Sequence, residues 1–340
     1  MNSMNPISRP LIASLLIASL LIVPSCSSPG DRLEVDVRDV SVPEAVIHRY
    51  DRDLFGVDQS DLRAGLEKLK PQYPFFLNTD LSDTMKLLAM RDYLVNERNT
   101  AFQKACDSAF PDLQPVSPEL TEAFRHVVHY FPGFRVPRLY SYISGGDYPY
   151  PVQWADSVML IALDCYLGRD FRLYKADQMP LYRMQRATPE YIVPDAMSAV
   201  YGGLFPAGLP GATLLDQMIQ AGKRLFFVNA MIPGADKRLI LGYTAGQYQW
   251  AVENEEHVWA AILSNQLLYN PGGQAIRSFL ADGPFTAEFS KDSPPRLGEF
   301  IGWRILLQYY EENPQVTLPE LLAEQDAQKI LTLSKYKPRK

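Results

Sequence analysis

The sequence predicts an α+β protein that is mainly helical and carries a small β-sheet in its N-terminal half. Two observations support this fold class. Every segment with a strand-like pattern lies before residue 168, and the longest helix-like segments of the second half follow residue 212. The 340 residues are 47% hydrophobic, which is enough apolar material for a large core. We expect residues 33–340 to form one domain.

The first residues have the pattern of a bacterial export signal. Residues 11–23 read LIASLLIASLLIV behind Arg9, an apolar run that is short for a transmembrane helix. The letters VPSC, ending at Cys26, follow and resemble a lipoprotein cleavage site. We therefore expect residues 1–25 to be a signal peptide, Cys26 to carry lipid and residues 26–32 to form a flexible tether. An ordinary signal peptide and a short membrane anchor are the alternatives.

Three segments are predicted to be strands. Residues 33–42 (LEVDVRDVSV) alternate apolar and polar side chains, as a half-buried strand does. Residues 135–143 (RVPRLYSYI) form a second strand that stops before a Gly-Gly pair. Residues 154–167 (WADSVMLIALDCYL) are an apolar run, broken by Asp156 and Asp164, that is typical of a buried central strand.

Helical spacing of apolar side chains predicts the other elements. In the first long helix, Met85, Leu88 and Tyr93 fall on one face. The segment that begins at Pro118 carries two glutamates near its start, which suits the positive end of a helix dipole. The predicted helices are residues 62–69, 82–104, 118–130, 212–228, 247–269, 272–280, 296–312 and 318–334.

Composition argues against several classes of function. Acidic residues outnumber basic ones by 39 to 33, which argues against electrostatic binding of nucleic acid. Besides Cys26 the chain has only Cys106 and Cys165, too few for a disulfide framework or a zinc ribbon, and we expect both in the core. The chain contains no HExxH, GxSxG, P-loop or GxGxxG motif. We therefore expect no cofactor.

The predicted helix 247–269 contains the most informative polar position. Glu255 falls on one stripe with Val252 and Trp259, so its carboxylate lies among apolar neighbours. A carboxylate in such surroundings must be paired, hydrogen-bonded or neutral. Glu255 therefore marks either a functional site or, as is commoner, a buried polar network in which it bonds an arginine or backbone amides.

His126 and His129 form an HxxH pair on the predicted helix 118–130. Three residues apart on a helix, they share a face and could hold a metal, but no third ligand lies close in the sequence. Structural histidines are the commoner alternative. The 19 tyrosines, several of them between residues 140 and 150, fit either a sugar-binding surface or half-buried packing.

Several longer phrases together resemble one protein family. They are LDCYLGRD from Leu163, TPEYIVPDAMSAV from Thr188, LLDQMIQAGKRLFFV from Leu214, GYTAGQYQWAVENEEHVW from Gly242, DGPFTAEFSKDSPPRLGEFIGW from Asp282 and AQKILTLSKYKP from Ala327. In this order they resemble the gliding motility lipoprotein GldB family of the Bacteroidota. The resemblance implies a lipid-anchored envelope protein whose partners belong to the gliding machinery and the secretion system that accompanies it.

The GldB family is itself similar to predicted zinc-dependent proteases, which implies a zincin-like fold. The corresponding helix, residues 191–204, contains no histidine, and Gln220 stands where relatives tend to carry glutamate. Without metal ligands, zinc hydrolysis lacks its Lewis acid. We therefore expect a protease fold that is no longer an enzyme and serves binding or assembly. Its cleft would be lined by residues 135–143 and by the helices at Tyr191 and Gln247.

A polar network is expected in or near this cleft, and the candidate residues are Glu255, Asp195, Gln220, Trp259, His126 and His129. An atypical metal-dependent peptidase built on Glu255 and the histidine pair is the main alternative, and a glycan-binding lipoprotein is a further one. Ser27 after Cys26 is not the aspartate that favours inner-membrane retention in some bacteria, so we expect attachment to the outer membrane.

Overall fold

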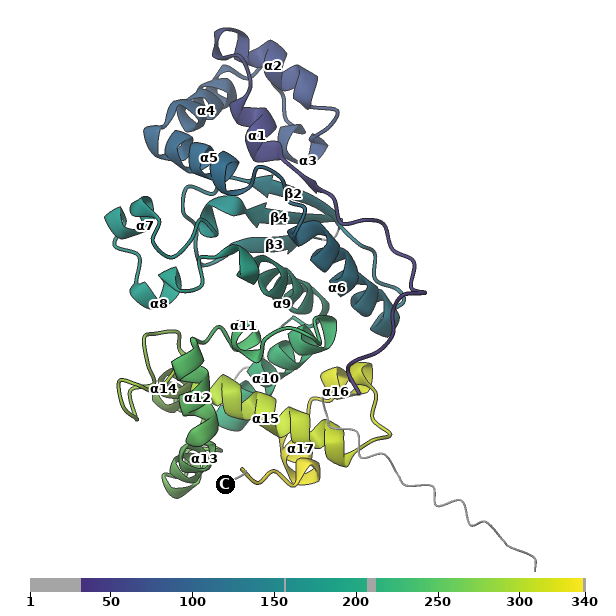
Figure 1. The fold of residues 1–340 in the computed structure, drawn as a ribbon, viewed down its shortest axis with the longest axis vertical. Coiled ribbons are helices and arrows are strands. Elements are labelled where there is room, and N and C mark those ends of the chain that lie inside the picture. The colour runs from purple at the N-terminus through teal and green to yellow at the C-terminus, as the bar shows by residue number, and fades with distance from the viewer. Residues whose placement is uncertain (1–31, 156, 207–211, 339–340) are drawn as a thin grey trace, which may run out of the picture.

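The computed structural model describes residues 32–155, 157–206 and 212–338. Most of these residues are helical, and one four-stranded sheet lies in the N-terminal half, which confirms the predicted α+β class. In Figure 1 the sheet lies between an upper group of N-terminal helices and a lower group of C-terminal helices. No described helix combines the length and the apolar character that crossing a membrane requires.

The strands of the sheet, in spatial order, are β1 (Ile47–His48), β2 (Arg138–Tyr142), β4 (Val158–Ala162) and β3 (Val152–Ala155). β2 pairs in parallel with β1 and β4, whereas β3 pairs antiparallel with β4. Leu139 faces Met159 across the β2–β4 pair, and Tyr140 faces Leu160. Successive side chains point to opposite faces of a strand, so these two pairs lie on opposite faces of the sheet.

The two faces of the sheet belong to two hydrophobic cores. Tyr140 and Val158 belong to the smaller core, which they share with α1 (Tyr50–Phe55), α2 (Leu62–Leu69), α3 (Pro74–Leu77) and α4 (Thr84–Val95). Met159 and Ile161 belong to the main core, together with α6 (Val116–Tyr130) and α9 (Ile192–Leu204). The sheet is therefore covered on both faces, as a mostly parallel sheet requires.

The other elements of the first half are α5 (Glu97–Ala109), α7 (Arg172–Ala176), α8 (Leu181–Met184) and short 3-10 turns at Gln59–Asp61, Leu163–Cys165 and Pro189–Tyr191. The second half contains α10 (Leu214–Met231), α11 (Lys237–Leu241), α12 (Ala245–Glu253), α13 (Glu255–Ser264), α14 (Gly273–Leu280), α15 (Leu297–Glu312), α16 (Leu318–Ala323) and α17 (Ala327–Ser334). Capping boxes begin α10, α12 and α16.

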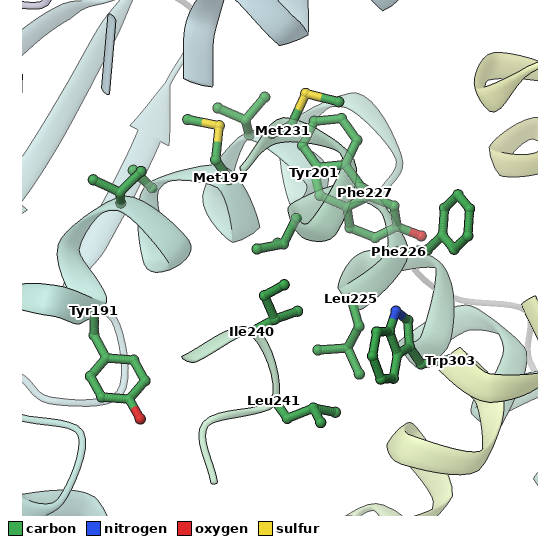
Figure 2. Close-up of a cluster of buried hydrophobic side chains, with 14 of the residues drawn as sticks. Tyr191, Met197, Tyr201, Leu225, Phe226, Phe227, Met231, Ile240, Leu241 and Trp303 are labelled. Carbon is green, nitrogen blue, oxygen red and sulfur yellow. The ribbon is translucent and has the colours of Figure 1, made fainter. Parts of the chain in front are cut away.

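α10 is the central helix of the second half, and most of its side chains are buried. It packs against α9 on one side and α15 on the other. Figure 2 shows this cluster, with Tyr201 of α9 beside Phe227 of α10 and Trp303 of α15 nearby. The ring centroids of Tyr201 and Phe227 lie 5.7 Å apart. α10 therefore joins the sheet-bearing half of the molecule to the C-terminal helices.

Two strand predictions are wrong, whereas the strand predicted at residues 135–143 is confirmed as β2. Residues 33–42 form no strand, and the buried Leu33 and Val37 pack without a sheet partner. Apolar and polar residues alternate here because one side of this irregular segment is buried. The apolar run 154–167 is not one strand, because β3 and β4 pair antiparallel with Ala155 opposite Val158, and a 3-10 turn follows.

Three long predicted helices are each divided into two. The first breaks at Asn96, whose side chain accepts hydrogen bonds from the amides at the start of α5. Its predicted apolar face is also wrong, because Met85 is 73% exposed. The segment 247–269 breaks at Asn254, between α12 and α13, and the segment 318–334 breaks before Asp326, which caps α17. The other predicted helices are confirmed to within a few residues.

Candidate functional site

Helix α9, which contains most of residues 191–204, packs against α10, which carries Gln220. Gln220 on α10 donates a hydrogen bond from Nε2 to Oη of Tyr201 on α9, at 3.4 Å. Met197, one turn earlier on the same side of α9, is fully buried. The polar side chains that meet at this contact are therefore a phenol and an amide.

These side chains do not fit a zinc ion. Zinc in proteins binds imidazole nitrogen, thiolate sulfur or carboxylate oxygen, and Tyr201, Gln220 and Met197 supply none of these. Within the described ranges, no three His, Cys, Asp or Glu side chains gather in a way that could hold a metal ion. The α9–α10 contact is thus a packed helix interface with a single polar bond.

Asp195 lies in the first turn of α9 and lines a cavity of about 200 Å³. Its Oδ2 accepts a hydrogen bond from Oη of Tyr166 at 2.9 Å, and its Oδ1 accepts one from Nη2 of Arg186 at 3.1 Å. Gly242, with φ of +69°, lets the backbone approach the Arg186 guanidinium, where a Cβ would be only 3.0 Å from Nε. Asp195 therefore holds the guanidinium of Arg186 at the wall of the cavity.

The other side chains that line this cavity include arginine and tyrosine, which donate hydrogen bonds, and one cysteine. The Arg183 guanidinium lies 3.6 Å from Asp282, and the phenol of Tyr182 lines the same space. Burial raises the pKa of the Cys165 thiol well above its ordinary value, so this thiol is a poor nucleophile at neutral pH. Both guanidinium groups, those of Arg183 and Arg186, are paired with carboxylates of the same cavity, so its lining is polar and balanced in charge.

Glu255 is the first residue of α13 and is 2% exposed. Its Oε1 accepts hydrogen bonds from Nε of Arg304 at 2.9 Å and from Oη of Tyr336 at 2.7 Å. Burial, together with the carboxylate of Glu255, raises the pKa of the Tyr336 phenol. Trp259, one turn later, packs edge-on against the Tyr336 ring at 5.2 Å. The arginine partner that the sequence left open is Arg304.

His126 and His129 both lie on α6, in different surroundings. His126 is 4% exposed, and its Nδ1 is 3.0 Å from the carbonyl oxygen of Glu122, one turn earlier. His129 is exposed, and its ring packs edge-on against Tyr130. His126 also lines a second cavity, of about 660 Å³, which contains none of the other candidate residues.

The candidate residues therefore do not form a single site. Gln220 lines a third cavity, of about 350 Å³, which it shares with the buried Lys223. Lys223 donates hydrogen bonds to the backbone carbonyls of Leu322 and Glu324, and burial lowers its pKa to about 8. Glu255 and Trp259 lie at the contact between α13, α15 and the C-terminal segment, apart from these three cavities.

Sequence reasoning missed three polar residues that the structure makes prominent. Arg186 and Tyr166 bind Asp195, and Lys223 binds the end of α16. Their partners lie 9, 29 and 99 residues away. No helix or strand periodicity links positions so far apart. The one signal in the sequence was that Lys223 lies within the mainly apolar segment that begins at Leu214.

The comparison that decides the family covers almost all of the described chain. A family model for the gliding motility protein GldB matches residues 30–338. The chain belongs to the GldB family. A search of curated proteins and a search of solved structures each give no match.

The residues that match the family model include the α9–α10 contact, the Asp195 cavity and the Glu255 network. The match therefore applies to both halves of the fold and not to one motif. Cys26 lies before the matched residues and outside the described ones. The family label marks these proteins as lipoproteins of the cell envelope, which agrees with the sequence pattern around Cys26.

Proposed function

We propose that this GldB-family chain is a lipid-anchored protein of the cell envelope that serves the gliding machinery, or the secretion system that accompanies it, by binding and not by catalysis. The observation that carries this proposal is the family match over residues 30–338. Its partners would be other envelope proteins of that machinery.

The proposed anchor is lipid attached to Cys26. The apolar run 11–23 and the letters VPSC support it, because this order of charge, apolar segment and cysteine is that of a lipoprotein signal. Two or three acyl chains suffice for stable membrane attachment. Ser27, where aspartate would favour the inner membrane, supports the outer membrane as the site of attachment.

A binding role is supported by the polar side chains that α9 and α10 bring together. We infer a zincin-like ancestry from the resemblance, with α9 and α10 as the helices that would have held the metal. Tyr201 and Gln220 now occupy their contact, and neither is a good zinc ligand. The nearby Asp195 cavity carries guanidinium and phenol donors that suit recognition of a polar group on a partner.

The anchor is tested by substituting Cys26→Ala in the full chain. We expect the protein to leave the membrane fraction and to lose incorporation of labelled palmitate, because no other cysteine lies near the export signal. Cell fractionation followed by immunoblotting measures the first effect. Cys106→Ala is the matched control and should remain in the membrane, since Cys106 is buried in the main core.

Two results would contradict the proposal. Membrane retention of the Cys26→Ala chain without bound lipid would remove the anchor. Stoichiometric zinc in the purified chain, with peptidase activity that disappears on His126→Ala, would replace the binding role by catalysis. Crosslinking of the native lipoprotein in envelopes, followed by its purification, should recover motility or secretion components.

A further inference from the structure

A fourth cavity, of about 450 Å³, lies in the N-terminal half between α1, α2, α3, α4 and the end of β2. These helices form the upper group in Figure 1. The cavity shares no lining residue with the three cavities described above. Leu54, Leu66 and Leu77, which are buried in the smaller core, form part of its wall, and Leu87 and Met90 of α4 extend it. Apolar cavities of about 300–1,000 Å³ are typical of small-molecule sites.

Tyr50, the first residue of α1, brings to this cavity a polar group that has no partner. The residue lines the cavity and is 5% exposed, and its ring stacks on Phe76 with the ring centroids 3.8 Å apart. Among the described residues, Oη of Tyr50 makes no hydrogen bond, yet it is not fully enclosed by protein. Burial raises the pKa of this phenol, so it keeps its proton at neutral pH and is a donor. A ligand with an acceptor oxygen would therefore complete a hydrogen bond that the protein leaves open.

The other hydroxyl groups that line the cavity already have partners. Oη of Tyr93 donates to a backbone carbonyl oxygen at 2.6 Å, and Oη of Tyr142 accepts from a side-chain amide at 3.2 Å. Oγ1 of Thr79 accepts from Nζ of Lys86 at 2.8 Å. A peptide brings an N–H and a C=O group with every residue, and these walls would leave most of them unpaired. An alkyl chain brings neither, so the cavity matches an alkyl chain that ends in one acceptor group.

We propose that this cavity binds a free fatty acid, whose carboxylate accepts a hydrogen bond from Oη of Tyr50 and whose alkyl chain lies against the buried leucines of α1, α2 and α3. A carboxylate is a stronger acceptor for a phenol than an uncharged carbonyl group is. Lys86 is the one charged side chain among the described residues that line the cavity, so no acidic group of the wall repels an anion. Because Lys86 itself lies 3.9 Å from Asp83, its attraction is weak, and the phenol and the leucines carry the recognition. The site goes beyond the proposed function, because it lies apart from the α9–α10 contact and does not depend on the anchor.

The test uses the full chain in digitonin, a detergent without an alkyl chain, and a dodecanoic acid that carries a photoreactive diazirine in its chain. After illumination, mass spectrometry measures which residues carry the label and in what amount. We expect saturable labelling of the residues that line the cavity. Unlabelled dodecanoate should compete, and each CH₂ group removed from the competitor should weaken it about fourfold, because less apolar surface is buried. Dodecylamine, which is a cation without an acceptor at neutral pH, should compete about tenfold less well or worse.

Two variants test the hydrogen bond and the space separately. Tyr50→Phe keeps the stacked ring but removes the hydroxyl, so it should weaken binding of dodecanoate about tenfold. Without ligand it should melt no lower than the parent chain, because the lost hydroxyl made no hydrogen bond. Ala89→Phe places a ring in the cavity from an exposed position of α4 and should abolish labelling. Ala109→Phe, at an exposed position of α5 outside the cavity, is the matched control and should leave labelling unchanged.

Any of four outcomes would overturn the proposal. The first is the absence of saturable labelling in the cavity, and the second is unchanged binding of dodecanoate to Tyr50→Phe. The third is equal labelling of Ala89→Phe and Ala109→Phe, and the fourth is competition by dodecylamine that equals that of dodecanoate. None of these outcomes changes the membrane attachment of Cys26→Ala, so failure of this site and failure of the anchor can be told apart.

Discussion

Glu255 shows that the role of a single polar residue in this protein depends on its tertiary contacts. Its side chain joins three parts of the fold, because Arg304 belongs to α15 and Tyr336 to the C-terminal segment. Oε1 of Glu255 accepts both of these hydrogen bonds, so the carboxylate ties the other two segments to the start of α13. A structural role explains this geometry without any catalytic function.

Substitution of Glu255→Gln should therefore destabilise the fold by about 1–3 kcal/mol, because it leaves the Arg304 guanidinium without its counter-ion. The cost stays below that of a fully buried pair, since Arg304 is 30% exposed and water can still reach it. Urea denaturation followed by circular dichroism measures the change.

The neighbouring Glu256 is the natural control for this substitution. It is exposed and adjacent in the sequence, so Glu256→Gln should change the free energy of unfolding by less than about 0.5 kcal/mol. Equal stability of the two variants would show that the Glu255 network does not hold the three segments together, and a functional role for Glu255 would then need to be reconsidered.

At the scale of elements, α10 and α15 pack with their backbones close together. Gly222 of α10 and Gly302 of α15 face each other's helices, and a Cβ on either would overlap backbone atoms of the other helix. A glycine inside a helix lowers helix propensity, so its presence at two facing positions is explained by this close approach.

Gly302→Ala should destabilise the protein by about 3 kcal/mol, because the new methyl group would collide with the backbone at Met218, which cannot move aside as a flexible side chain would. Gly246→Ala in α12 is the control, since a Cβ there meets no atom within 4 Å. It should stabilise α12 by about 0.5–1 kcal/mol. Thermal unfolding compares the two. A neutral Gly302→Ala variant would show that the two helices can separate without cost.

At the scale of the whole molecule, the segment that begins at Arg32 connects the C-terminal helices to the sheet. Arg32 donates hydrogen bonds to the backbone carbonyls of Tyr310, Pro314 and Val316, and its guanidinium lies 3.6 Å above the Tyr310 ring. With lipid on Cys26, as proposed, the membrane would lie within about 20 Å of this point, because six residues reach no further. The C-terminal segment that holds Arg32 would then lie close to the membrane.

Arg32→Ala should release the start of this segment while the cores remain folded. We expect amide hydrogen exchange across residues 33–42 to become about tenfold faster or more, since loss of the clamp favours local opening. Arg38→Ala is the control, because Arg38 is exposed and pairs with the neighbouring Asp36. Unchanged exchange in Arg32→Ala would show that Leu33 and Val37 hold the segment without the clamp.

The sequence by itself determined the fold class, the strand at residues 135–143, most of the helices and the family. These depend on local periodicity and on long blocks of similar sequence, which need no knowledge of distant contacts. It also placed Glu255 in a buried polar setting, because a carboxylate on an apolar stripe must have a partner.

Only the tertiary structure decided where elements break and which residues meet. Asn96 and Asn254 interrupt apolar patterns that continue past them, and the alternation of residues 33–42 comes from packing and not from a sheet. The Asp195 cavity and the cavity that His126 lines join segments far apart in the sequence. Local sequence patterns indicate which side chains are buried. A site is formed by residues that are distant in the sequence, and their relative positions are set by the packing of the whole chain.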